Sequence, residues 1–173
     1  MTNSIKIKRK INKFNKKIKV SGDKSLSIRW VLFSSIASGI SKAKNLLLSD
    51  DVLAALNVIR KLGIKSKINK KECVIYGKGI DGYKYNNKLT LDAKNSGTLG
   101  RLILGLLINT PKLIKLIGDK SLSKRDFKRI AKPLSKFGAK IKLSNRNNLP
   151  LTILGSKNLK PIKYIENIGS ARM

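Results

Sequence analysis

The spacing of apolar side chains changes repeatedly along this chain between that of a strand and that of a helix. Residues 5–20 alternate basic and apolar side chains, which predicts one or two strands with one solvated face. After Gly22 the apolar residues recur at helical spacing as far as Ile36, and Gly39 is expected to end this helix. The beginning of the chain therefore predicts a strand segment followed by a helix.

The next stretch predicts a second helix among three strands. Residues 43–48 form a short apolar block, and residues 65–69 and 72–76 have strand-like patterns, so all three are expected to be strands. Between them, Ser49 precedes two aspartates, an N-cap signal for a helix that should run through Leu62. The predicted order is helix, strand, helix, strand, strand.

The second half of the chain predicts the same order of elements again. The segment KFGAK near its end follows the similar segment KLGIK by 75 residues, which sets a repeat of about 70 to 78 residues. Helices are expected over 99–108 and 121–137, and strands over 113–117, 140–143 and 151–154.

A third unit of this length would begin near residue 170, where the chain ends. We therefore expect an incomplete α/β (α+β) protein, with about two of three units of a first domain in residues 21–173. Residues 1–20 are expected to be a leading strand segment that joins a second domain.

The charge is strongly positive, with 39 basic and 9 acidic residues and a net charge of +30, which favours anionic partners. The lysines are spread along the chain and aromatic residues make up only 5%, whereas a nucleic-acid binder more often has a clustered basic patch with aromatics. We therefore expect no nucleic-acid partner, although a basic nucleic-acid-binding protein is kept as an alternative.

Several chemistries are excluded by composition. The chain has no histidine, which removes imidazole bases and histidine metal ligands. Its single cysteine, Cys73, lies in an apolar run and is predicted to be a buried strand residue. The longest apolar block, residues 102–108, is too short to span a bilayer, so we expect no membrane partner and a cytoplasmic location.

The octet GDKSLSIR, Gly22 to Arg29, is the first candidate for an anion site. It opens a predicted helix, where free N–H groups and the helix dipole favour an anion, and Lys24, Ser25 and Arg29 add donors. Ordinary N-capping beside a solvated lysine explains the same residues equally well. The spacing is not that of a Walker A loop, so no nucleotide is implied.

Asn95-Ser96-Gly97-Thr98 is a similar small-residue turn into a helix, with Arg101 one turn further on. A near copy of the octet, GDKSLSKR, ends at Arg125, which by default would be a solvated surface cation. This copy lies 96 residues after the first and is out of phase with the repeat. We interpret it as a loop of similar chemistry rather than the structural equivalent of the first octet.

Six motifs in order, GDKSxSxR, NLLxSDD, NSGTxxR, GDxSLxKR, PLxxxGA and the closing GSAR, together resemble the EPSP synthase family of enolpyruvyl transferases. The sister family that acts on UDP-N-acetylglucosamine lacks the first of these loops. The resemblance implies an inside-out α/β barrel domain built from repeated units. It also implies transfer of the enolpyruvyl group of phosphoenolpyruvate to the 5-hydroxyl of shikimate 3-phosphate, without metal or organic cofactor, by a protein that is monomeric at full length.

The resemblance also implies roles for particular residues. Lys24 would contact both substrates, and Ser25 and Arg29 would hold shikimate 3-phosphate. Gly97 and Arg125 would hold phosphoenolpyruvate.

At the end of the chain, Ser170 and its neighbours, including Arg172, would bind the phosphate of shikimate 3-phosphate. Arg172 stands where the family has glutamine, and Asp126 stands where it has proline. The catalytic carboxylates of the family are expected beyond this chain and none is assigned here. We therefore expect the isolated chain to have no measurable transferase activity. A non-catalytic fragment that still binds phosphate groups at Lys24 and Arg125 is kept as an alternative.

Overall fold

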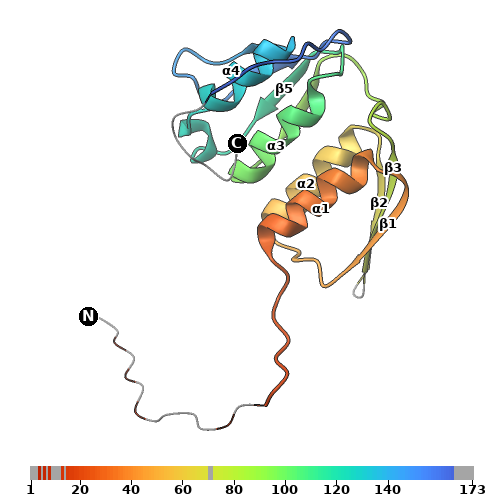
Figure 1. The fold of residues 1–173 in the computed structure, drawn as a ribbon, viewed down its shortest axis with the longest axis vertical. Coiled ribbons are helices and arrows are strands. Elements are labelled where there is room, and N and C mark those ends of the chain that lie inside the picture. Colours follow the sequence, from red (N-terminus) through yellow and green to blue (C-terminus); the bar gives the residue numbers. More distant parts are fainter. Residues whose placement is uncertain are drawn as a thin grey trace.

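The computed structural model describes residues 4, 6, 8, 13, 15–69 and 72–165. The first unit has the predicted order of elements and lies next to the N-terminal segment (Figure 1). Its elements are α1 (Lys24–Ile36), β1 (Ser38–Lys44), α2 (Asp50–Lys61), β2 (Lys65–Ile68) and β3 (Glu72–Lys78).

The second unit repeats this order after one additional strand. A short 3₁₀ helix, η1, also precedes its second helix. The elements are β4 (Leu89–Asp92), α3 (Gly97–Leu107), β5 (Ile114–Ile117), η1 (Leu122–Lys124), α4 (Lys128–Phe137), β6 (Lys140–Lys142) and β7 (Leu151–Leu154).

The pairing of the strands repeats as well as their order. In the first unit β3 pairs antiparallel with β1 on one side and β2 on the other, and in the second unit β7 lies in the same way between β5 and β6. The additional strand β4 pairs parallel with the free edge of β5. Both sheets are open in the described part of the chain, and the predicted incomplete α/β architecture of repeated units is confirmed.

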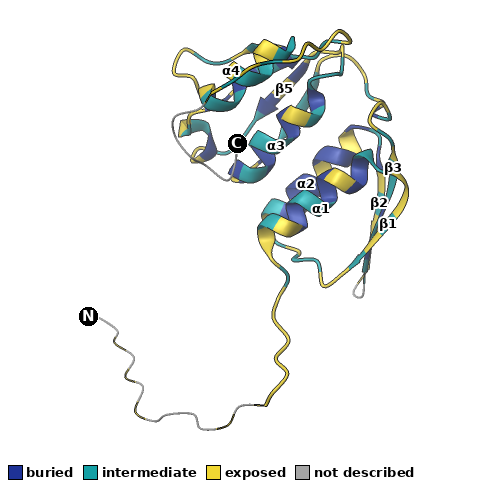
Figure 2. Cartoon of the chain, viewed as in Figure 1, coloured by how far each residue is buried: buried dark blue, intermediate teal, exposed yellow. Residues whose placement is uncertain are grey.

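The helices bury their apolar sides against the sheets and against one another, as Figure 2 shows by the dark blue faces of α1, α2 and α3. Ile28 of α1, Ile59 of α2 and Ile75 of β3 are fully buried, as are Ile103 of α3 and Leu116 of β5. In Figure 1 α1, α2 and α3 run in the same direction. Their N-termini therefore lie at the same end of the molecule.

Three expectations for the first part of the chain are wrong. Residues 15–20 form no strand; their side chains are exposed, and no strand pairs with them in the part described. The strand expected at 43–48 lies earlier, at β1, because Asn45 has a positive φ of 57° that ends it. The glycine expected to end α1, Gly39, instead lies within β1, since the helix ends at Ile36.

The single helix expected over 121–137 is also wrong, because it is divided into η1 and α4. Arg125 is extended between them, and the carboxylate of Asp126 accepts the Lys128 N–H at 2.7 Å in a local turn directly before α4. The predicted end is confirmed, since Gly138 caps α4 with a φ of 119°.

One expectation from composition has a structural counterpart. Cys73 is 1% exposed within β3, and burial raises the pKa of its thiol, as predicted for a structural cysteine rather than a nucleophile. Across the described ranges, the structure contains no helix with the length and apolar character needed to cross a membrane.

Gly77 of β3 provides a test of how α1 packs on its sheet. A Cβ at this position would lie 2.2 Å from the carbonyl oxygen of Ala37 and 2.3 Å from that of Ser34, and neither backbone atom moves easily. Gly77→Ala is therefore expected to lower the free energy of unfolding by about 1–3 kcal/mol in urea denaturation.

Gly105→Ala is the matched control, because a Cβ there meets nothing within 4 Å and the position is interior to α3. This change should stabilise the protein by about 0.5–1 kcal/mol. Equal effects of the two substitutions would contradict the packing described.

Candidate anion-binding site

The N-terminus of α1 is capped as the simpler interpretation of the octet predicts. The carboxylate of Asp23 accepts the Leu26 N–H at 2.7 Å. Gly22 is required by a close approach, since a Cβ there would lie 2.2 Å from the carbonyl oxygen of Asn45. The loop before α2 therefore packs directly against the start of α1.

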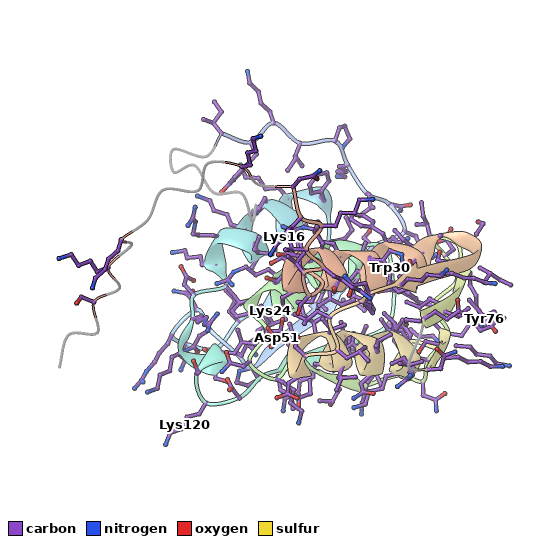
Figure 3. The ribbon with its side chains drawn as sticks, turned by 90° about the horizontal axis from the view of Figure 1, so that it is seen from below. Lys16, Lys24, Trp30, Asp51, Tyr76 and Lys120 are labelled. Atoms are coloured by element: carbon purple, nitrogen blue, oxygen red, sulfur yellow. The ribbon has the colours of Figure 1, made fainter. Side chains whose placement is uncertain are left out.

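Lys24 forms an ion pair that the sequence did not predict. Its ammonium lies 3.1 Å from the carboxylate of Asp51 in the first turn of α2, with side-chain exposures of 54% and 18%. Figure 3 shows the two residues close together, whereas Lys120, at the same position in the second octet, lies at the periphery. Lys24 is thus held at the paired starts of α1 and α2 while its side chain stays accessible.

Ser25 and Arg29 are both half-buried in the first turns of α1. They are four residues apart and so lie on the same face of the helix. The structure therefore places a hydroxyl and a guanidinium on one face of α1, in its first two turns.

The second candidate group surrounds the N-terminus of α3. Ser96 caps the helix by accepting the Leu99 N–H at 3.3 Å. A Cβ built on Gly97 would lie 2.8 Å from an Nη1 atom of both Arg101 and Arg125, so these two nitrogens are at most 5.6 Å apart, twice that distance. Two cations beside the positive end of a helix dipole create a strong preference for an anion.

Parallel strands bring the supporting residues together. Asp92 of β4 pairs with Ile117 of β5, so the segments after both strands leave the same edge of the sheet. There the amide of Asn95 donates to the carboxylate of Asp119 at 2.7 Å, and Arg125 donates to the amide oxygen of Asn95 at 3.3 Å. Arg125 is therefore half-buried and bonded rather than a free surface cation.

Asp119 has an anionic carboxylate that is stabilised by its surroundings. The Leu122 N–H, donated at 2.7 Å, is the main cause that lowers the pKa of this carboxyl, and the Asn95 amide and the charge of Arg125 lower it further. These bonds thus keep the negative charge of Asp119 close to Arg125, and the bond to Asn95 fixes the direction of the Arg125 side chain.

The two octets share a cap but start helices of different length. Asp119 accepts the Leu122 N–H as Asp23 accepts that of Leu26, each at 2.7 Å. The first cap starts the 13-residue helix α1, whereas the second starts only the three-residue η1. The interpretation that the octets are not structurally equivalent is confirmed.

The structure adds contacts that the sequence does not predict. Asp51 is predicted only as a helix-start residue, and the bond between Asn95, part of the predicted turn, and Asp119 joins segments 24 residues apart. Of the predicted residues, Ser170 and Arg172 lie outside the described part of the chain.

Comparison with known proteins identifies the family. Residues 8–173 match the family described as EPSP synthase (3-phosphoshikimate 1-carboxyvinyltransferase). A 3-phosphoshikimate 1-carboxyvinyltransferase of Streptococcus suis is 42% identical over 170 residues, which cover 98% of this chain and 40% of that protein. One of Bacillus subtilis is 39% identical over 165 residues, covering 95% and 38%.

Solved structures agree with the sequence match. An EPSP synthase from Acinetobacter baumannii superposes with a TM-score of 0.84 at 38% identity, over 90% of this chain and 36% of that one. The likeness defines the architecture as that of an enolpyruvyl transferase. The chain belongs to the EPSP synthase family, and it spans about 40% of the length of the curated relatives it matches.

Gly97→Ala tests the closeness of the two guanidinium groups. The new methyl group would force both side chains away from the helix start, while the fold should survive because guanidinium groups move easily. Binding of inorganic phosphate, followed by calorimetry, should weaken on the order of tenfold or more, which is the size of the effect expected from losing one charge-assisted hydrogen bond. Unchanged affinity would contradict the site, and Gly105→Ala again serves as control.

Asp119→Asn tests the charged network through its pH dependence. The folded-state pKa of Asp119 is below its ordinary value of 3.8, so its stabilising contribution is present above that pH and is lost as the pH falls through the folded-state pKa. The variant should therefore lose more stability relative to the native chain at pH 7 than near pH 3 in urea unfolding. A difference independent of pH would contradict this role.

Proposed function

We propose that this chain supplies binding groups for both substrates of an enolpyruvyl transfer. The reaction joins the enolpyruvyl group of phosphoenolpyruvate to the 5-hydroxyl of shikimate 3-phosphate and releases phosphate. The proposal is supported by the family and by one observation above all, the convergence of two guanidinium groups on Gly97 at the start of α3.

Phosphoenolpyruvate is assigned to the N-terminus of α3. It carries a phosphate and a carboxylate, and guanidinium groups bind both in a planar, bidentate manner. Gly97 leaves room for such a group to reach the helix N–H donors, and Arg125 is directed there by Asn95.

Shikimate 3-phosphate is assigned to the start of α1. Ser25 and Arg29 share a face there, and Ser170 and Arg172 are proposed to complete the phosphate site. Lys24 is proposed to contact both substrates. Its ion pair with Asp51 holds the ammonium in place until a substrate anion competes for it.

The transfer adds the 5-hydroxyl oxygen to C2 of phosphoenolpyruvate, whose methylene carbon is protonated, and the tetrahedral intermediate then loses phosphate and a methyl proton. Lys24, Arg125 and the helix N–H groups stabilise anions and orient the substrates, which contributes to such a reaction without transferring protons. The acid and base are assigned to no residue of this chain. We therefore expect the 173-residue chain alone to release no phosphate from the two substrates.

Calorimetry with shikimate 3-phosphate tests the proposal. Lys24→Ala should weaken binding roughly tenfold, because it removes a charge-assisted contact. Lys120→Ala is the matched control, since it removes the same charge from the same position of the second octet at the periphery. It should leave the affinity unchanged.

Equal losses in the two variants would indicate nonspecific attraction to a basic surface and would overturn the site. The rival function, a nucleic-acid-binding protein, is favoured only by the net charge of +30. It requires affinity for arbitrary DNA or RNA that falls steeply with salt.

A further inference from the structure

Arg101 is a second arginine beside the start of α3, and its contacts differ from those of Arg125. It donates from Nη1 to the carbonyl oxygen of Gly97 and from Nη2 to that of Asp126, each at 3.3 Å. Its guanidinium carbon lies 5.2 Å from the centre of the Phe127 ring. One side chain thus contacts the first turn of α3 and the segment that leads into α4.

We propose that Arg101 is a positioning residue that holds Arg125 over the start of α3. Arg125 directly precedes the two residues that Arg101 contacts, and it lies in extended chain between η1 and α4. Without a helix to fix this backbone, its position depends on contacts with its neighbours. The inference rests on the proposed anion site at Gly97 and Arg125.

The packing of Phe127 supports this role of Arg101. Phe127 is fully buried, and its N–H donates to the carbonyl oxygen of Asn147 at 2.9 Å. A Cβ on Gly100 would lie 3.3 Å from this ring, so glycine lets the ring pack closely on α3. The ring then supports the guanidinium of Arg101. The segment after Arg125 is therefore held by Arg101 on one side and by the backbone of Asn147 on the other.

The geometry favours positioning over direct binding of the anion. Both terminal nitrogens of Arg101 already donate to backbone carbonyls, and one face of the group lies on an aromatic ring. A lysine would keep the charge but lose the planar fork and the stacking. Arg101→Lys therefore separates the geometric contribution from the electrostatic one.

A double-mutant cycle tests the proposal by titrating phosphoenolpyruvate into four proteins: the native chain, Arg101→Lys, Arg125→Ala and the double variant. Arg101→Lys should weaken binding roughly tenfold. In the Arg125→Ala background the same change should have no further effect, because the residue it positions is gone. Arg146→Lys, an exposed arginine elsewhere, is the control and should bind like the native chain.

Native affinity in Arg101→Lys overturns the proposal. A loss that persists undiminished in the Arg125→Ala background also overturns it, since Arg101 would then contact the anion itself. Thermal unfolding of each variant, followed in parallel, shows whether a loss of affinity reflects a loss of fold.

A second measurement keeps this inference separate from the proposed function. If Arg125→Ala leaves the affinity for phosphoenolpyruvate unchanged, the proposed substrate site fails, but the positioning of Arg125 is still measurable. Nitrogen-15 relaxation of the Arg125 Nε–H group without ligand should show greater motion in Arg101→Lys than in the native chain. Equal motion overturns the positioning role.

Discussion

The site depends on holding positive groups beside the positive ends of helices. Arg101 and Arg125 both approach Gly97 at the start of α3, an arrangement that is unfavourable until an anion is bound. The protein maintains this arrangement through neighbouring oxygen atoms. Arg101 donates to backbone carbonyls, and Arg125 donates to the amide oxygen of Asn95, which is bonded in turn to the Asp119 carboxylate. The cost of this arrangement in the empty site is the source of its preference for phosphate and carboxylate groups.

The repeated unit explains why two such groups form. Each unit has a helix that starts close to the loop before its second helix: Gly22 packs on Asn45 in the first, and Asn95 bonds to Asp119 in the second. Since α1, α2 and α3 run in the same direction, the groups gather at one end of the molecule (Figure 1). In the first unit Lys24 is held directly by the carboxylate of Asp51. In the second unit Arg125 is held by the side-chain amide of Asn95, which is itself bonded to the carboxylate of Asp119.

The sequence predicted the elements whose apolar spacing is strong and missed those set by pairing or local capping. Helices α1, α2 and α3 are predicted from their buried stripes, whereas β4 has four residues and exists because it pairs with β5. The division of the expected helix at Arg125 is accompanied by a local turn, in which the carboxylate of Asp126 accepts the Lys128 N–H and offers the backbone an alternative to a continuous helix. The roles of Asn95 and Arg101 depend on contacts across the fold, which no local pattern contains.

The most direct test is an amide NMR titration of the chain with phosphoenolpyruvate, with inorganic phosphate as a second probe. The account predicts that the largest shifts fall on the backbone amides at the starts of α1 and α3, together with the side-chain signals of Arg125. Small shifts distributed over the exposed lysines, with no cluster at these helix starts, would contradict it.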